Sequence, residues 1–267
     1  MSASTDVISF YSFKGGTGRS TALANVAYEL AEKGLTVGCL DLDLAAPGLH
    51  MIFPNVGPPY GRATKIHDFL RGEDEEIRNI DNYIIDVGER IGKTRHDAPD
   101  GELLLIAGDI KPPGPGNPRD MMTKALELRE DFIDREDLDY LLIDSRSGLS
   151  NHMIPLFDEA DRFLAFHRWT FQHKTGTERL AEWLDKVPSP NDMMSVASNV
   201  PKSVKDSEIE SWAMKELYRY NFSSHFVINS SDILRKKETI VALEDRNAPV
   251  AKQFRSLANQ LSENQIS

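Results

Sequence analysis

A glycine-rich segment near the start of the chain has the composition of a phosphate-binding turn. It reads Lys14-Gly15-Gly16-Thr17-Gly18-Arg19-Ser20-Thr21 and lies between an apolar run at 7–12 and a helical pattern that begins near Ser20. At such a junction, backbone N–H groups without a helical partner point toward an anion, and the helix dipole favours negative charge. We therefore expect residues 14–21 to bind the phosphates of a nucleotide, with a merely tight turn as the alternative.

The turn departs from the common P-loop pattern G-x-x-x-x-G-K-[ST] at two positions. Phe13 stands where that pattern has its first glycine, and Arg19 stands where it has lysine. Arginine keeps the positive charge, but it is longer than lysine and donates through a planar fork. We expect nucleotide binding to survive this change, and hydrolysis to be slow or to need a partner.

Three aspartates follow apolar runs that have the composition of buried strands. Asp41 and Asp43 close the run Leu40-Asp41-Leu42-Asp43, in a strand that we place beside the first one, and Asp144 closes Leu141-Leu142-Ile143-Asp144. Ligands of open α/β sheets bind at the carboxyl ends of the strands, so these acids and the turn should meet at one site. Beside a triphosphate they would act through Mg²⁺ held partly by water. Capping of strands or helices is their alternative role.

The remaining chain alternates apolar strands with amphipathic helices. This pattern is typical of an α/β fold with a largely parallel, twisted sheet and helices on both faces, and we expect a single domain over 1–267. Residues 51–118 look irregular or insert-like, with a Pro/Gly loop at 111–118 that is a surface spacer or a partner contact. Expected strands lie at 7–12, 35–41, 103–107, 140–144, 163–167, 195–198 and 225–229, and expected helices at about 20–33, 122–133, 174–186, 207–218 and 249–261.

Composition excludes several classes of protein. Lys+Arg is 31 and Asp+Glu is 42, which gives a net charge of −11. This charge disfavours a surface that binds nucleic acid as a whole, although a local basic spot is compatible with it. One cysteine excludes an internal disulfide and a Cys-built zinc site. No stretch approaches ~20 apolar residues and no signal peptide is evident, so we expect no stable membrane insertion and a cytoplasmic location.

The segment Lys14-Gly15-Gly16-x-Gly18-Arg19-Ser20 resembles the deviant Walker A motif of the MinD/ParA group of P-loop ATPases (the SIMIBI class), in its KGGVGR variant. Asp41-Leu42-Asp43 resembles the second acidic motif of that family, and residues 141–148 resemble its Walker B strand and the switch that follows. The carboxyl-terminal part, with residues 199–201 and the closing helix, is similar in layout. The resemblance covers nearly the whole chain, although residues 51–102 match no known motif.

The resemblance implies an ATP-dependent sandwich homodimer with ATP and Mg²⁺ as cofactors. It implies that Lys14 reaches the partner subunit's phosphates, that Asp43 orients the attacking water and that Arg19 takes part in catalysis. The ion would be held by Ser20 and, through its water shell, by Asp41 and Asp144. The residues that would contact the nucleotide are Gly15, Gly16, Thr17, Gly18, Arg19, Ser20, Thr21, Asn199 and Pro201.

From these features we predict a slow Mg²⁺-dependent ATPase that acts as a nucleotide-dependent dimerisation switch and recruits or regulates a protein partner. Two alternatives stay open. Arg19 is compatible with a nucleotide-binding scaffold subunit that does not hydrolyse, and related folds include small-molecule kinases and ATP-dependent ligases, which would need an acceptor pocket built by residues 51–102. No motif distinguishes ATP from GTP. We expect the closing helix to pack on the sheet and not on a membrane, because its polar face has only Lys252 and Arg255 as cations.

Overall fold

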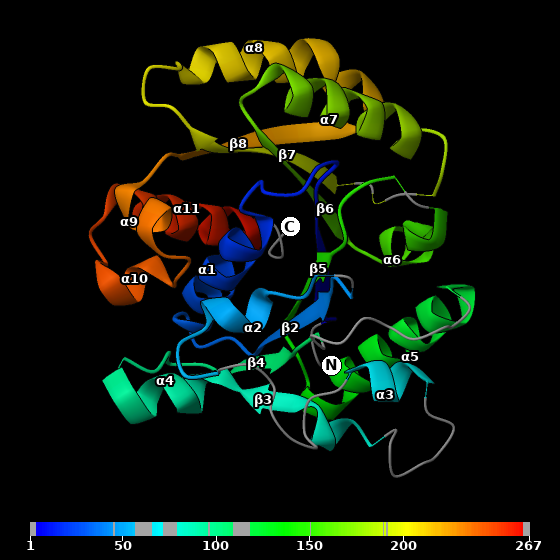
Figure 1. The fold of residues 1–267 in the computed structure, drawn as a ribbon, viewed down its shortest axis with the longest axis vertical. Coiled ribbons are helices and arrows are strands. Elements are labelled where there is room, and N and C mark those ends of the chain that lie inside the picture. The colour runs from blue at the N-terminus through cyan, green and yellow to red at the C-terminus, as the bar shows by residue number, and fades with distance from the viewer. Residues whose placement is uncertain are drawn as a thin grey trace.

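An eight-stranded sheet forms the centre of the chain in a computed structural model. The structure describes residues 4–44, 46–56, 66–71, 79–95, 97–108, 118–149, 151–188, 190 and 192–263. The strand order is β3-β4-β2-β5-β1-β6-β7-β8, and every pairing is parallel except that of β3 with β4 (Figure 1). The strands are β1 (Asp6–Tyr11), β2 (Val37–Leu42), β3 (Ile84–Asp86), β4 (Leu103–Ile106), β5 (Tyr140–Ser145), β6 (Arg162–Arg168), β7 (Asp192–Val200) and β8 (Phe222–Asn229).

Helices cover both faces of this sheet, as the alternating pattern predicts (Figure 1). One face packs against α1 (Arg19–Ala31), α2 (Leu49–Ile52), α4 (Val87–Arg95), α9 (Asp232–Lys236), α10 (Val241–Glu244) and α11 (Pro249–Glu263). The other face packs against α3 (Ile66–Arg71), α5 (Pro118–Glu136), α6 (Ile154–Asp158), α7 (Phe171–Leu184) and α8 (Asp206–Glu216). Because the central strands are covered on both sides, β1 and β5 are buried along their whole length. The predicted fold class is therefore confirmed.

The second strand does not lie beside the first one, which corrects the expected placement. β5 lies between β1 and β2, and it pairs with both in parallel. The register sets Asp41 of β2 opposite Asp144 of β5. One strand pair thus brings Asp41 and Asp144 together directly. The glycine-rich turn at 14–21, called the phosphate turn below, follows β1 and lies on the β5 side of these acids.

The region with no recognisable motif contains more regular structure than its sequence indicates. Between residues 66 and 95 the structure has α3, a 3₁₀ turn at Ile80–Asn82, the antiparallel edge strand β3 and α4. These elements are short, so few apolar positions repeat in them and periodicity does not reveal them. The Pro/Gly loop expected at 111–118 lies outside the described residues, apart from Pro118, where α5 begins.

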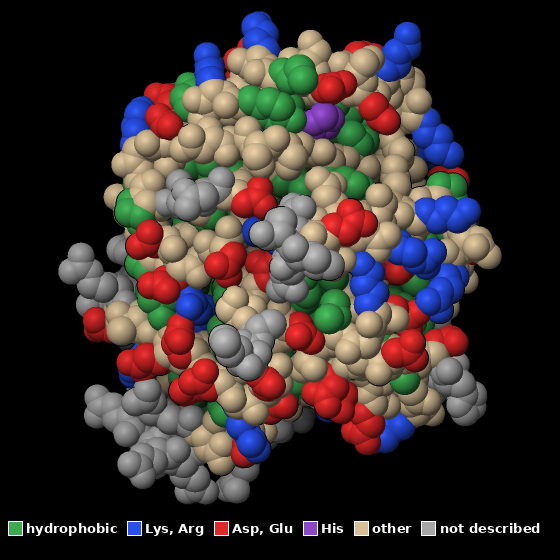
Figure 2. Space-filling model, turned by 180° about the vertical axis from the view of Figure 1, so that it is seen from behind, with side chains coloured by type: hydrophobic (Ala, Val, Ile, Leu, Met, Phe, Trp, Pro, Cys, Tyr) green, Lys and Arg blue, Asp and Glu red, His purple; other side chains and the backbone are tan. Residues whose placement is uncertain are grey.

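The closing helix packs as expected. α11 lies against α1 and β8, and its apolar side chains, including Phe254 and Leu257, are buried. Arg255, expected on the outside, instead donates from Nε to Glu29 of α1 at 2.8 Å. In the described part of the chain, no helix has both the length and the apolar character that a membrane crossing requires. Figure 2 shows acidic side chains spread over one face, with lysine and arginine side chains mainly around its rim and several of them grouped at the right.

Candidate functional site

The glycine-rich turn joins the end of β1 to the start of α1. Gly16 and Gly18 have φ angles of 73° and 76°, which lie in the left-handed region that glycine adopts without strain. Gly18 caps α1 without any side-chain hydrogen bond, and the first turn of the helix contains no acid. The first N–H groups of this 13-residue helix therefore have no side-chain acceptor at the cap. These groups can bind an anion, as the sequence predicts.

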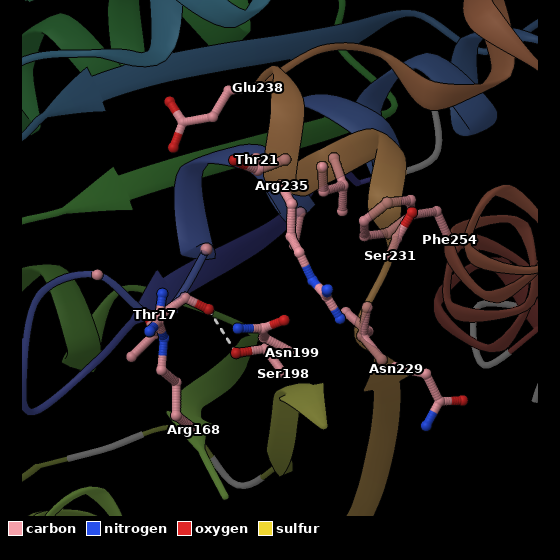
Figure 3. A pocket seen from close by; sticks show the side chains of 15 residues that line it. Thr17, Thr21, Arg168, Ser198, Asn199, Asn229, Ser231, Arg235, Glu238 and Phe254 are labelled. Atoms are coloured by element: carbon pink, nitrogen blue, oxygen red, sulfur yellow. Dashed lines mark hydrogen bonds between the residues drawn. The ribbon is translucent and has the colours of Figure 1, made fainter. Parts of the chain in front are cut away.

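A cavity of about 330 Å³ opens beside this turn (Figure 3). Its walls come from the turn, the first turn of α1, the carboxyl ends of β6, β7 and β8, α9 with the segment that follows it, and Phe254 of α11. The backbone of Gly16–Gly18 lies at one side, and Ile228, Leu234 and Phe254 supply an apolar wall. A polar end and an apolar wall in a cavity of this size suit a small ligand that is charged at one end.

The predicted nucleotide-contacting residues divide between this cavity and its surroundings. Gly16, Thr17, Gly18, Thr21 and Asn199 line it. Pro201 lines a neighbouring hollow that shares Asn229, Ser231 and Arg235 with the first one. The other predicted residues, which do not line the cavity, are Lys14, Gly15, Arg19 and Ser20.

Arg19 turns away from the cavity and toward the acids at the strand ends. Its guanidinium donates from Nε to the Asp144 carboxylate and from Nη2 to Asp43, at 3.3 Å. Arg19 is 7% exposed and Asp144 is 1% exposed, so this pair is buried, whereas Asp43 is 18% exposed. The side chain in the lysine position of the P-loop pattern thus neutralises carboxylates in this structure.

Asp41 is held by backbone groups. Its carboxylate accepts N–H bonds from Asp43, Gly48 and Leu49 at 3.1–3.2 Å. Burial raises the pKa of Asp41 well above the usual range of a carboxyl, and the neighbouring Asp144 adds to the rise. Burial also raises the pKa of Asp144, against the opposing effect of Arg19. A divalent cation here would favour the charged form of both groups.

The donors at this place fit Mg²⁺. Asp41 and Asp144 face each other across the β2–β5 pair, and Ser20 interacts with the Asp144 carboxylate. Carboxylate and hydroxyl oxygens are hard ligands of the kind that Mg²⁺ prefers. Within the described residues no group of three His, Cys, Asp or Glu side chains forms a metal centre by itself. The ion would therefore need phosphate and water oxygens to complete its shell.

The comparisons with solved structures agree with the fold described above. The cell division ATPase MinD of Pyrococcus furiosus superimposes with a TM-score of 0.71 at 20% identity, covering 97% of this chain and 99% of that one. MinD from Pyrococcus horikoshii, solved with Mg-ADP, gives 0.70 at 18% identity, covering 97% and 96%. A chain of the Aquifex aeolicus MinC:MinD cell division protein complex gives 0.68 at 19% identity, with the same coverage. The chain has the MinD/ParA fold.

Sequence comparisons find similarity that includes the glycine-rich turn of this MinD/ParA-like chain. Residues 3–66 match the ParA family model of NUBPL iron-transfer P-loop NTPases. An uncharacterized ATP-binding protein of Methanocaldococcus jannaschii is 28% identical over 154 residues, which are 58% of this chain and 49% of that protein. The flagellum site-determining protein YlxH of Helicobacter pylori is 27% identical over 149 residues, 54% and 42% of the two chains. The matched regions thus span about half the length of these two relatives.

A third relative matches over nearly its full length. It is a second uncharacterized ATP-binding protein of Methanocaldococcus jannaschii, 26% identical over 275 residues, which cover 91% of this chain and 92% of that protein. The likeness therefore extends beyond the phosphate turn to the whole α/β unit.

Phe13, which stands where the P-loop pattern has its first glycine, has a packing role in this MinD/ParA-like chain. Its ring packs against α7 at Gly176, where an added Cβ would lie 2.3 Å from Phe13 Cδ1. Next to it, Lys14 Nζ donates to Gln172 of α7 at 3.3 Å. The aromatic side chain therefore joins the phosphate turn to α7. The sequence of the turn alone does not predict this contact.

Sequence reasoning missed the residues that form the far walls of the cavity. Arg168 ends β6, Ser198 lies near the end of β7, and Arg235 and Glu238 lie on and after α9. The Ser198 hydroxyl donates to the carbonyl of Thr17 and, at 3.2 Å, to that of His167 (Figure 3). Only the positions of these four residues could have indicated them from the sequence. Each one ends or follows a predicted strand, and ligands of open α/β sheets bind at the carboxyl ends of the strands.

Proposed function

We propose that this chain binds ATP with Mg²⁺ in the cavity beside the phosphate turn, hydrolyses it slowly and uses the nucleotide to control dimerisation and the recruitment of a protein partner in the cytoplasm. The observation that carries the proposal is the cavity itself. Gly16–Gly18 and the start of α1 offer N–H groups to phosphates, and the wall of Ile228, Leu234 and Phe254 suits a base. Structural neighbours described as MinD, one of them with Mg-ADP, support it.

The acids supply the remaining parts of a phosphoryl-transfer site. Bound Mg²⁺ would neutralise phosphate charge, with Ser20, Asp41 and Asp144 as its protein-side oxygens. Asp43 is half-buried at the edge of this cluster and can orient water near the phosphates. Positioning and charge neutralisation carry most of the catalysis in reactions of this type, so a small set of groups is sufficient.

Exposed apolar side chains support dimerisation through the same edge of the sheet. Four large apolar side chains are exposed among the described residues, and three of them follow parallel strands at their carboxyl ends. Met51 follows β2 and is 68% exposed, Leu149 follows β5 and is 44% exposed, and Phe171 follows β6 and is 81% exposed. Exposed apolar groups around a ligand site favour coverage by another protein surface. We assign that surface to a second copy of this chain, with Lys14 on the same edge.

Light-scattering mass with simultaneous phosphate release tests this function. The purified chain would be measured with Mg²⁺ and ATP, with Mg²⁺ and ADP, and without nucleotide. We expect a monomer that becomes a dimer with ATP only, and a slow release of phosphate that returns it to monomer. A mass that does not respond to nucleotide, together with no phosphate, would contradict the switch.

A nucleotide-binding scaffold without turnover is the second candidate, and the ion pairs of Arg19 with Asp144 and Asp43 favour it. Asp43→Ala separates the two functions. In an ATPase, loss of the water-orienting carboxylate should lower phosphate release by about 10²-fold at unchanged nucleotide affinity. Glu182→Ala, which removes an exposed acid on α7, is the matched control. Equal phosphate release from both variants would leave the scaffold function.

The kinase or ligase alternative gains no support from the cavity. Among the described residues, none between 51 and 102 lines it. The described residues of that region therefore contribute no wall to the cavity beside the phosphate turn.

A further inference from the structure

The position of Arg19 leaves the phosphate side of the cavity without the cation that a P-loop lysine supplies. Both ends of its guanidinium are engaged with carboxylates, and one of them, Asp144, is almost fully buried. In the proposed site Mg²⁺ acts on Asp144 through its water shell, so withdrawing Arg19 toward the cavity would still take the direct hydrogen-bond partner from that buried carboxylate, which is unfavourable. Arg19 therefore stays with the acids.

Two other cationic side chains near the phosphate turn, Lys14 and Arg146, do not line the cavity. Lys14 donates to Gln172 on α7, and it does not line the cavity. Arg146, which follows Asp144, is exposed and also lies outside the cavity lining. Among the described residues, two arginines do line it, Arg168 and Arg235.

Arg168 lies on the phosphate side of the cavity. It is the last residue of β6 and pairs in register with Ser198 of β7. Ser198 in turn donates its hydroxyl to the carbonyl of Thr17, so the backbone at Arg168 is tied to the phosphate turn within one strand pair. Figure 3 shows the Arg168 side chain directed toward Thr17.

The Arg168 guanidinium is free to meet a ligand. The residue is exposed, and among the described residues its side chain forms neither a hydrogen bond nor an ion pair, whereas its backbone carbonyl accepts from the Thr170 N–H at 2.8 Å. Burial lowers the pKa of the neighbouring His173, and the positive charges of Arg168 and Lys14 lower it further. Arg235, on the opposite wall, is already paired with Asp232 at 3.4 Å, and the one acid in the lining, Glu238, follows that same helix.

We propose that Arg168 is the residue that contacts the phosphates of the bound nucleotide in the place of the P-loop lysine, while Arg19 remains paired with Asp144 and Asp43. The inference rests on the proposed nucleotide-binding function and specifies how this chain provides the charge. A guanidinium fork can donate two parallel N–H bonds to phosphate oxygens, so its reach from β6 compensates for the loss of the lysine.

Calorimetric titration of ATP and of ADP into four proteins tests the proposal, in one buffer at one salt concentration. They are the unmodified chain, Arg168→Gln, Arg168→Lys and Arg179→Gln. Arg179 is an exposed arginine on α7 that does not line the cavity, so its variant controls for the loss of one surface charge. Urea unfolding of each protein checks that the fold is unchanged.

We expect Arg168→Gln to bind ATP and ADP about 10- to 100-fold more weakly, the range of a charge-assisted hydrogen bond or a bidentate pair. Arg168→Lys should recover part of the affinity, and Arg179→Gln should bind as the unmodified chain does. Equal affinity of Arg168→Gln and Arg179→Gln would overturn the role of Arg168 and leave the nucleotide site intact. Absence of ATP binding by the unmodified chain would instead overturn the proposed function together with this inference.

Discussion

At the scale of single residues, two arginines of the candidate site occupy different places, whereas the P-loop pattern has one lysine. Arg19 neutralises the acids of β2 and β5, and the cavity is lined by Arg168 at the phosphate side. Ser198 connects the phosphate turn to β6, because its hydroxyl donates toward the carbonyls of Thr17 and His167. The turn is thus positioned by a hydroxyl from a strand that is remote in sequence.

Ser198→Ala should therefore loosen the turn. The variant leaves the Thr17 carbonyl without this donor, which costs about 1–3 kcal/mol of unfolding free energy for a buried group. Nucleotide affinity should fall in parallel, because the N–H groups of Gly16–Gly18 lose a fixed position. Urea unfolding and calorimetric titration measure the two effects.

Ser195→Ala is the matched control for this hydroxyl. Ser195 lies on the same strand, is fully buried, and its hydroxyl has no hydrogen-bond partner within the described structure. Its removal should leave stability unchanged or slightly raised, since no partner is lost. If both variants behaved alike, the bond to Thr17 would carry no positioning role.

At the scale of elements, the phosphate turn is clamped between α1 and α7. The sequence predicts the first of these contacts, because glycine at positive φ before an amphipathic helix has a known geometry. It does not predict the second, because the fit between Phe13 and Gly176 depends on how α7 crosses the end of β1. Tertiary packing of this kind leaves no periodic trace in either segment.

Gly176→Ala tests the clamp between the turn and α7. The new methyl group would overlap the Phe13 ring, and such overpacking costs about 1–3 kcal/mol of unfolding free energy. Combining it with Phe13→Ala removes the overlap, so the double variant should lose less stability than the sum of the two single changes. A cycle of four urea unfolding curves measures the coupling, and strict additivity would refute the contact.

The amino ends of β1 and β6 contain a second buried pair whose effect depends on pH. Arg162 lies 3.1 Å from Asp6, and burial raises the pKa of Asp6 to about 6 in spite of that cation. A raised carboxyl pKa means that the folded chain binds more protons than the unfolded one between pH 4 and 6. The contribution of Asp6 to the free energy of unfolding therefore falls as pH rises through that window. Above pH 6 the folded chain contains a costly charged carboxylate.

Asp6→Asn removes this titration. The stability of the variant relative to the unmodified chain should become more favourable as pH rises from 4 to about 6, and then level off. Urea unfolding at pH 4.5, 5.5, 6.5 and 7.5 follows the difference, which isolates Asp6 from the other titrating groups. A difference that does not change with pH would show that Asp6 is not the source.

At the scale of the whole molecule, the apolar and glycine patterns are enough to predict the fold class and the place of the phosphate turn. Seven of the eight strands, and α1, α5, α7, α8 and α11, appear close to their expected positions. Strand order was not predictable in the same way, since nothing in β2 indicates that β5 separates it from β1. The partner of Arg19 was equally hidden, because it depends on that order.

Three exposed apolar side chains follow strands that end at the same edge of the sheet. Met51, Leu149 and Phe171 come from distant parts of the sequence, and the parallel sheet brings the strands before them to a common end. Phe171→Glu should abolish the ATP-dependent dimer, since a carboxylate would be buried against an apolar partner surface. ATP binding to the monomer should persist, because Phe171 does not line the cavity.

Met214→Glu provides the control for this change. Met214 is 57% exposed, but it lies on α8, away from the carboxyl ends of β2, β5 and β6. Light-scattering mass with Mg²⁺ and ATP should therefore show a dimer for Met214→Glu and a monomer for Phe171→Glu. A dimer that survives the Phe171 change and is lost with the Met214 change would place the interface on α8. The phosphate turn of one copy would then not face that of the other, and Lys14 would act within its own subunit.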